Sequence, residues 1–210
     1  APLSKAEPGQ PTRKDKAVAL AQDQAIELPS TSHFVIIDNK GNVVSMTTTI
    51  ENGFGSRLMT NGFLLNNELT DFSFVPKADG KLVANRVEPN KRPRSSMSPT
   101  IVMKQGQPVL AIGSPGGSRI ISYVSNALIR HLLWDEPLQD SLNNPHLINR
   151  FGTYDIEEGP SADQLATSLQ EMGYKVNRRA LNSGLHAIKI TPDQLIGAAD
   201  PRREGVVMGR

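Results

Sequence analysis

A run of hydroxyl residues, Ser30-Thr31-Ser32, stands where a polar, proline-marked leader gives way to a strongly patterned sequence. The residues that follow, His33 to Asp38, are typical of a β-strand, so Thr31 lies at the start of an ordered element. A threonine hydroxyl attacks carbonyl groups only when a base removes its proton. The boundary is therefore the place to look for a nucleophile that begins as an ordinary peptide-linked residue.

A glycine-rich turn, Gly113-Ser114-Pro115-Gly116-Gly117-Ser118-Arg119, joins an expected strand to an expected helix. Backbone N–H groups at the start of a helix form a site for an anion. A phosphate and the oxyanion of an acyl-transfer intermediate are both possible occupants. The glycine spacing matches neither nucleotide fingerprint, and the loop lacks a lysine. A purely structural turn is equally compatible with this sequence.

Two carboxylates, Glu68 and Asp71, lie in a polar turn. They could perform acid–base chemistry, bind a cation, or follow an asparagine that caps a helix. The four histidines are not spaced as metal ligands, and a structural, hydrogen-bonded role is favoured for each of them: His33, His131, His146 and His186. No metal or cofactor is expected.

Composition limits the remaining possibilities. The 210 residues carry a net charge of +2, so nucleic acid and anionic membranes are not favoured as partners. The basic run Lys91-Arg92-Pro93-Arg94 is interpreted as solvated surface. Without cysteine there are no disulfides and no thiolate sites. No apolar run approaches the roughly 18–20 residues of a membrane span.

The pattern of elements predicts one α+β domain of helices packed on antiparallel sheets. Residues 1–14 are expected to be irregular, and 15–27 to form a weak helix. After the hairpin of 33–38 and 42–50 we expect a short buried strand at 63–65. The later elements are a hairpin (98–104, 108–112), a helix with its apolar face between Ile120 and Leu132, a short helix ending before Pro145, a strand at 154–156, a helix opened by a capping box at Ser161, and strands near 175, 185–190 and 195–197.

Five segments, in order, resemble the small catalytic subunit of γ-glutamyltranspeptidases over residues 31–205: Thr31-Ser32-His33-Phe34, Thr47-Thr48-Thr49-Ile50-Glu51, the run 65–72 (LNNELTDF), the run 91–100 (KRPRSSMSPT) and the glycine turn. The resemblance implies the N-terminal nucleophile hydrolase fold, a four-layer αββα sandwich. It also implies self-cleavage between Ser30 and Thr31. Residues 1–30 would then be the tail of a large subunit, and 31–210 the catalytic small subunit.

The resemblance assigns roles to individual residues. Thr31 is the expected nucleophile, with its freed α-amino group, whose pKa is about 8 in peptides, as the base. Thr49, on the same strand face as Thr47, orients the nucleophile. The remaining roles are the oxyanion site (Gly116, Gly117), the pocket for the substrate α-ammonium (Glu51, Glu68, Asp71) and the pocket for its α-carboxylate (Ser95, Ser96). An arginine from the large subunit is expected to complete the last pocket.

The expected reaction is hydrolysis or transfer of γ-glutamyl groups from glutathione-like amides to water, an amino acid or a peptide. By the resemblance, residues 76–88 correspond to a lid segment over the active site. This segment is short and lacks an aromatic residue. Water should therefore reach the acyl-enzyme easily, which favours hydrolysis, and the pocket has room for glutaryl groups. A glutaryl-cephalosporin acylase is thus one alternative, and a homologue that fails to cleave itself and serves as a binding domain is another. The family resemblance implies a large-subunit partner and a periplasmic or secreted location.

Overall fold

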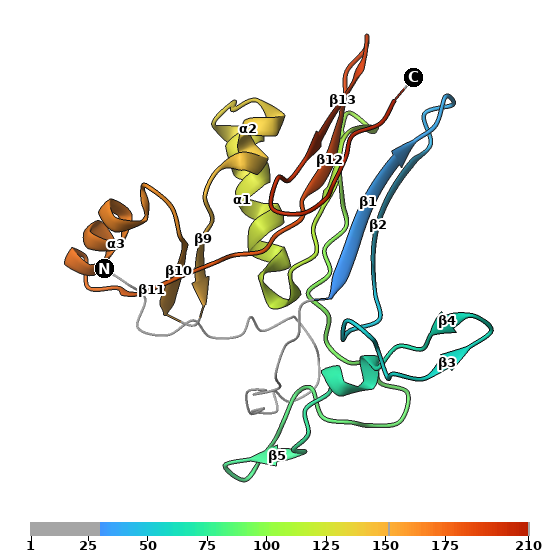
Figure 1. The fold of residues 1–210 in the computed structure, drawn as a ribbon, viewed down its shortest axis with the longest axis vertical. Helices are drawn as coiled ribbons and strands as arrows, with labels where there is room; N and C mark the ends of the chain where they lie inside the picture. Colours follow the sequence, from blue (N-terminus) through green and yellow to red (C-terminus); the bar gives the residue numbers. More distant parts are fainter. Residues whose placement is uncertain (1–29, 151, 210) are drawn as a thin grey trace.

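The computed structural model describes residues 30–150 and 152–209. The leader and the helix expected at 15–27 lie outside the described residues. Figure 1 shows the elements, which are β1 (Thr31–Ile37), β2 (Val43–Thr49), β3 (Met59–Thr60), β4 (Phe63–Leu64), η1 (Glu68–Asp71), β5 (Lys77–Ala78), β6 (Lys81–Leu82), β7 (Thr100–Lys104), β8 (Gln107–Gly113), η2 (Gly117–Arg119), α1 (Ile120–Leu133), α2 (Leu138–Asn143), β9 (Leu147–Arg150), β10 (Thr153–Glu157), α3 (Ala162–Glu171), β11 (Lys175–Arg179), β12 (His186–Ile190) and β13 (Leu195–Ala199).

Strands β1 and β2 form the predicted antiparallel hairpin, in which Thr31 lies opposite Thr49. Its turn is built on Asp38, whose carboxylate accepts the N–H groups of Lys40 and Asn42, each at 2.9 Å. Strict alternation places Thr47 and Thr49 on the half-buried face of β2 and Thr48 on the exposed face. The hairpin therefore confirms the predicted face for the threonines.

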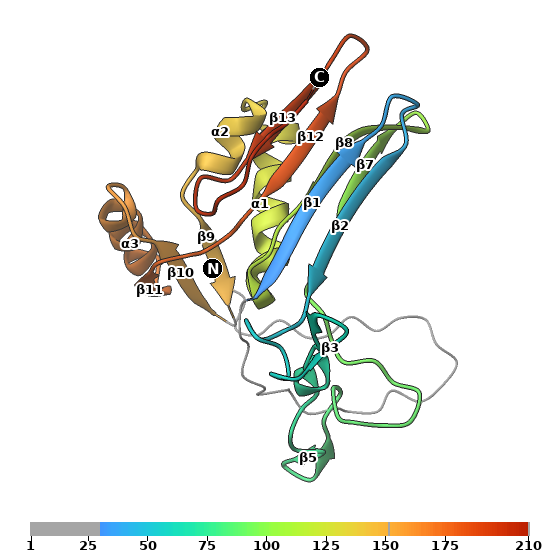
Figure 2. The same cartoon turned by 45° about the vertical axis from the view of Figure 1, so that its right-hand side comes forward.

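A four-stranded antiparallel sheet in the order β13-β12-β8-β7 forms the centre of the molecule. Helices α1 and α2 cover one face of this sheet, and the β1–β2 hairpin packs on the other (Figure 2). Thirteen buried residues make up the core between sheet and helices, among them Leu110, Ile112, Tyr123 and Leu185. Helix–sheet–hairpin layering of this kind confirms the predicted α+β class.

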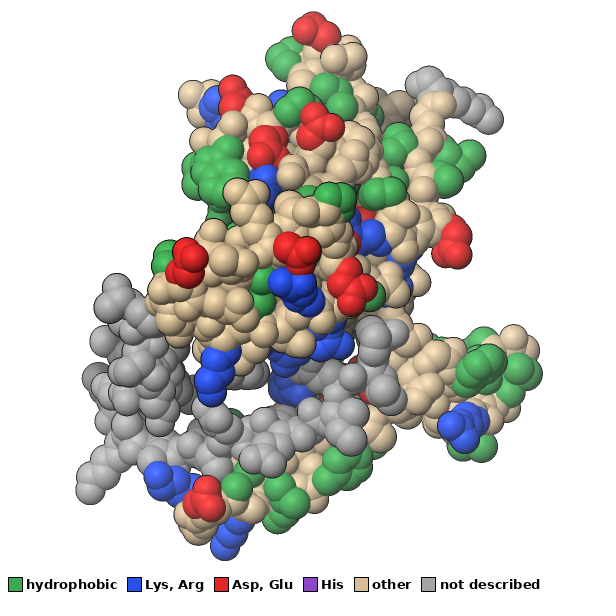
Figure 3. All heavy atoms as spheres, turned by 60° about the vertical axis from the view of Figure 1, so that its left-hand side comes forward, with side chains coloured by type: hydrophobic (Ala, Val, Ile, Leu, Met, Phe, Trp, Pro, Cys, Tyr) green, Lys and Arg blue, Asp and Glu red, His purple; other side chains and the backbone are tan. Residues whose placement is uncertain are grey.

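A smaller sheet, β11-β10-β9, carries α3 on one side. Strands β10 and β11 run parallel, joined by the α3 crossover, so the sheet is mixed rather than purely antiparallel as expected. Acidic and basic side chains lie interspersed on the face seen in Figure 3, in keeping with the small net charge. Within the described residues, no helix combines the length and apolarity needed to cross a bilayer.

Two local predictions are wrong. The side chain of Ser161 accepts no capping hydrogen bond, because its backbone is already helical (φ −89°, ψ −6°) whereas a capping residue is extended. The strand at 63–65 is short and not buried, since Phe63 is 56% exposed. It pairs only with β3, in a hairpin that projects from the body (Figure 1). The stretch 73–94 contains the small β5–β6 hairpin.

Candidate active site

A cavity of about 50 Å³ gathers nearly all the residues that the sequence singles out. It opens where β1 begins, β2 ends and the glycine turn leaves β8. Gly116 and Ser30 are not among its lining residues. Those that line it are Thr31, Thr49, Glu51, Glu68, Asp71, Ser95, Ser96 and Gly117, together with Arg94, Met97, Ser118 and Ile120.

The Thr49 hydroxyl is fixed by two hydrogen bonds. Its Oγ1 accepts the N–H of Glu51 at 2.9 Å and lies 2.9 Å from the carbonyl oxygen of Ser30, to which it donates. A hydroxyl has one proton, so accepting the amide leaves that proton for the Ser30 carbonyl. This carbonyl belongs to the peptide bond that joins Ser30 to Thr31. The structure thus polarises the bond at which cleavage is predicted.

Glu51 occupies a strained position at the end of β2. Its φ of +70° is unusual for a residue other than glycine, and such strain is found mainly where the surroundings enforce it. The side chain is only 6% exposed, and Asn67 donates a hydrogen bond from Nδ2 to its Oε2. Asn67 also accepts the N–H of Asn52 at 3.0 Å. One amide side chain therefore fixes both the strand end and the carboxylate.

Three carboxylates come together at this end of the cavity. Burial raises the pKa of Glu68, and the negative charges of Asp71 and Glu51 raise it further. The Oε1 atom of Glu68 is buried and accepts no hydrogen bond within the described residues. Asn67 makes no side-chain cap to the short helix η1, but Asn66 Oδ1 accepts the N–H of its first residue, Glu68, at 3.0 Å, so an asparagine does bond to the start of this helix. Such a cluster is electrostatically suited to an ammonium group.

The two serines lie on the other wall. Ser95 Oγ accepts the N–H of Met97 at 3.2 Å, and Arg94 lies beside them in the cavity lining. The buried side chain of Asn85 joins this wall to the acidic turn. Its Nδ2 donates to the carbonyl of Asp71 at 2.6 Å, and its Oδ1 accepts the Arg94 N–H at 2.9 Å. This amide side chain thus joins the acidic turn to the segment that carries the serines.

The glycine turn needs glycine at two positions. Gly116 has a φ of +134° and Gly117 a φ of +60°. A Cβ atom on Gly116 would lie 2.5 Å from the ring of Tyr123, a distance that side chains do not tolerate. Gly117 lines the same cavity as Thr31; it is the first residue of η2, which α1 follows directly. The structure therefore places a helix N-terminus in the cavity that Thr31 lines, an arrangement that an oxyanion site requires.

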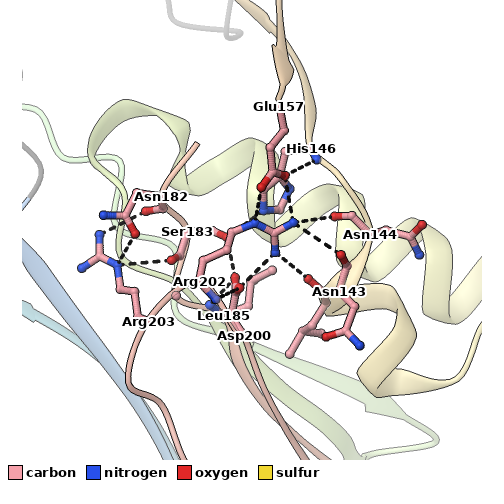
Figure 4. Close-up of polar contacts among 12 residues, drawn as sticks. Asn143, Asn144, His146, Glu157, Asn182, Ser183, Leu185, Asp200, Arg202 and Arg203 are labelled. Atoms are coloured by element: carbon pink, nitrogen blue, oxygen red, sulfur yellow. Dashed lines mark hydrogen bonds and ion pairs between the residues drawn. The ribbon is translucent and has the colours of Figure 1, made fainter. Parts of the chain in front are cut away.

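The C-terminal loop contacts Thr31 through Arg203, whose Nη1 donates to the Thr31 carbonyl at 3.3 Å. Figure 4 shows the polar cluster behind it. The buried carboxylate of Asp200 accepts the hydroxyl of Ser183 and two hydrogen bonds from Arg202, each at 3.0 Å. Arg202 also donates to Glu157. This cluster fixes the loop that carries Arg203.

The histidines are hydrogen-bonded, as predicted for structural residues. The partners are Thr47 for His33 (2.8 Å), Glu136 for His131 (2.7 Å), Ser183 for His146 (2.7 Å) and Gly184 for His186 (3.0 Å). Burial lowers the pKa of His33 to about 4, so it is neutral at pH 7. No group of three potential metal ligands occurs among the residues that the structure describes.

Sequence reasoning missed Arg94, Asn67 and Asn85. Arg94 was interpreted as solvated surface, although its position next to the paired serines was a usable signal. The two asparagines act through long-range contacts, such as the 16 residues that separate Asn67 from Glu51, and their local sequence does not reveal those contacts.

The family profile described as Gamma-glutamyltranspeptidase matches residues 4–210. The glutathione hydrolase proenzyme of Bacillus subtilis (strain 168) is 41% identical over 185 residues, which cover 85% of this chain and 30% of that protein. The glutathione hydrolase proenzyme of Escherichia coli (strain K12) is 36% identical over 210 residues, covering 95% and 35%. The structure of gamma-glutamyltranspeptidase from Pseudomonas nitroreducens complexed with L-DON has a TM-score of 0.75 at 35% identity, covering 85% of this chain and 98% of that one.

The layered sheets, with a threonine at the start of a strand, define an N-terminal nucleophile hydrolase fold. The chain belongs to the gamma-glutamyltranspeptidase family. It spans about a third of the length of these curated relatives.

Proposed function

We propose that the protein hydrolyses or transfers γ-glutamyl groups from glutathione-like amides, after cutting its own chain between Ser30 and Thr31. The observation that carries this proposal is the shared cavity. Thr31 lines it together with three carboxylates and a pair of serines. A glutamyl group needs these same features in this arrangement: a cation-binding pocket, an anion-binding pocket and a nucleophile.

Self-cleavage would begin with attack of Thr31 Oγ1 on the carbonyl carbon of Ser30. The Thr49 hydroxyl, 2.9 Å from that carbonyl oxygen, would stabilise the negative charge that develops there. The C–N bond then breaks, the Thr31 nitrogen takes the hydroxyl proton, and an ester links Ser30 to Thr31 Oγ1. Water hydrolyses the ester and leaves Ser30 with a carboxylate. Thr31 becomes a chain terminus with a free amine.

In turnover, the Thr31 amine takes the proton from its own hydroxyl, and Oγ1 attacks the γ-carbonyl carbon of the donor. Gly116 and Gly117 would donate N–H groups to the oxyanion. The departing amine takes the proton from the Thr31 ammonium, and a γ-glutamyl ester remains on Oγ1. Attack by water releases glutamate, whereas attack by an amino acid or peptide amine completes a transfer.

Donor recognition follows from charge. Glu51, Glu68 and Asp71 would bind the α-ammonium and thereby relieve their mutual repulsion. Ser95 and Ser96 would bind the α-carboxylate together with an arginine of the large subunit. A glutaryl donor has no ammonium and would leave three carboxylates without a counter-charge. This argument favours γ-glutamyl over glutaryl substrates.

The same proposal includes a partner and a location. We expect 31–210 to be the catalytic small subunit, and 1–30 to be the tail of a large subunit made as part of the same precursor. The exposed apolar side chains on the outer face of the β1–β2 hairpin, such as Ile36 at 55% and Met46 at 45%, support a covering partner of this kind. Family membership favours a periplasmic or secreted location.

The test uses the full-length precursor and two chromogenic donors, γ-glutamyl-p-nitroanilide and glutaryl-p-nitroanilide. We expect the first to be hydrolysed with a kcat/KM at least tenfold higher. Thr31→Ala should abolish turnover and cleavage together. A preference for the glutaryl donor would support the acylase alternative, and full turnover by Thr31→Ala would overturn the assignment of the nucleophile.

A further inference from the structure

The last residue of the glycine turn forms a buried ion pair with a distant strand. Arg119 donates two hydrogen bonds to Oδ2 of Asp155, from Nε at 3.0 Å and from Nη2 at 2.6 Å. Asp155 is only 4% exposed and belongs to β10, in the smaller sheet. Arg119 ends η2, two residues after Gly117. The pair therefore connects the turn that lines the cavity to a sheet outside the cavity.

Asp155 is itself rigidly placed. Asn177 of β11 donates to its Oδ1 at 3.0 Å, and Arg179 lies 3.9 Å from its Oδ2. Burial alone would raise the pKa of Asp155, but the hydrogen bonds from Arg119 and Asn177 outweigh burial and lower it. The carboxylate is consequently ionised at neutral pH, and both of its oxygens have partners. The Asp155 carboxylate therefore holds the Arg119 guanidinium in one orientation.

The glycine turn needs such a support. Apart from its chain neighbours, no described residue has an atom within 4 Å of the place where a Cβ on Gly117 would stand, so nothing packs against this glycine from that side. It is restrained through its neighbours: Gly116 on one side, pressed against Tyr123, and the η2 turn on the other. The Arg119 N–H closes that turn on the Gly116 carbonyl at 3.4 Å. The Gly116 carbonyl and the Gly117 N–H belong to one planar peptide unit, so motion of Arg119 would reorient the Gly117 N–H.

We propose that Asp155 is a positioning residue for the oxyanion site, which it aligns through Arg119. This inference rests on the proposed function, because it presumes that Gly116 and Gly117 bind an oxyanion. An N–H group that is positioned for the oxyanion stabilises the transition state but not the bound substrate. Loss of the ion pair should consequently lower kcat and leave KM nearly unchanged.

The test compares Asp155→Asn with the wild-type full-length enzyme. The variant keeps the shape of the side chain and removes its charge. We measure kcat and KM for γ-glutamyl-p-nitroanilide, and the Ki of two inhibitors. One is a glutamate analogue with a boronic acid in place of the γ-carboxyl, which forms a tetrahedral adduct with a hydroxyl nucleophile. The other is glutamate, which forms no adduct.

The matched control is Asp163→Asn. Asp163 also pairs with an arginine, Arg178 of β11, but its side chain is 81% exposed and far from the turn in sequence. Asp163→Asn also neutralises an aspartate that is paired with an arginine, but that arginine is not part of the glycine turn. We expect it to match the wild type in all four constants.

For Asp155→Asn we expect kcat to fall about tenfold, less than the roughly 100-fold loss of a whole oxyanion donor. The boronate Ki should rise by a similar factor, while KM and the glutamate Ki stay within twofold. Arg119→Lys retains the positive charge but loses the two-point contact with Asp155. Its kcat and boronate Ki should lie between those of the wild type and those of Asp155→Asn. This variant provides the test if Asp155→Asn does not fold.

Unchanged kcat and boronate Ki in a folded variant would overturn the inference, and so would equal weakening of boronate and glutamate. Failure of the proposed function would look different, since the wild-type enzyme itself would then not hydrolyse the anilide.

Discussion

Replacement of Thr49 by valine isolates the interaction that the structure makes with the predicted scissile bond. Valine has nearly the same shape and suits a β-strand, so β2 should form normally. The change removes the hydrogen bond to the Ser30 carbonyl and the acceptor of the Glu51 N–H. Both effects act at one point of the hairpin, opposite Thr31.

The size of the effect follows from the charge on the carbonyl oxygen. In the intact chain the oxygen is neutral, and the hydrogen bond contributes about 1 kcal/mol. During attack it becomes an oxyanion, for which a positioned donor contributes about 3–4 kcal/mol. The difference of about 2–3 kcal/mol corresponds to a cleavage rate roughly 30–150-fold lower. Thr49→Val should also lower the unfolding free energy by about 1–2 kcal/mol, because the Glu51 N–H loses its hydrogen-bond acceptor.

Cleavage is followed by denaturing electrophoresis of freshly purified full-length precursor at fixed temperature. Thr48→Val is the control, since it makes the same change one residue earlier on the exposed face of β2. We expect Thr48→Val to cleave at the wild-type rate. Cleavage of Thr49→Val within threefold of the wild-type rate would refute the argument that this hydroxyl stabilises the oxyanion.

Three further outcomes follow from the polar contacts. Burial and two neighbouring carboxylates raise the pKa of Glu68, so its ionised form destabilises the unliganded protein. Glu68→Gln should therefore raise the unfolding free energy at pH 7 by about 0.5 kcal/mol, and this gain should disappear as pH falls from 7 to about 4. The same change should raise the KM for the γ-glutamyl donor about tenfold. Asn85→Leu separates the cavity walls and should raise KM more than it lowers kcat in steady-state assays. Asp200→Asn should cost about 3 kcal/mol in urea unfolding at pH 7; hydrogen bonds lower the pKa of Asp200 despite burial, so this difference should shrink as pH falls below about 4. An unchanged value in any of these measurements would contradict the role given to that residue.

Features with a local cause were predictable from the sequence. Alternation along β2 gave the threonine faces, and the Asp38 turn gave the hairpin. The parallel β10–β11 pair was also recognisable, because a strand, a helix and a strand follow one another over 153–179. The capping box failed because sequence specifies which residues are present but not the backbone angle of Ser161. Phe63 was placed inside on its apolarity, although the described part of the chain does not bury it.

The supporting contacts of the site were not predictable in this way. Asn85 reaches Asp71 across 14 residues, and Arg119 reaches Asp155 across 36. Neither pair has a characteristic spacing, since each depends on how separate elements pack. Family resemblance identified the residues expected to touch substrate and Thr49 beside them, whereas Asn67, Asn85 and Asp155 emerged only from the structure.

The central claim is that Thr31 becomes the first residue of the catalytic chain. It is tested most directly by the intact masses of the chains in purified full-length protein, with N-terminal sequencing of the smaller one. The account predicts two chains, the smaller beginning Thr31-Ser32-His33, and one uncut chain in Thr31→Ala. A single wild-type chain that persists on incubation, or a cut at any other bond, would contradict it.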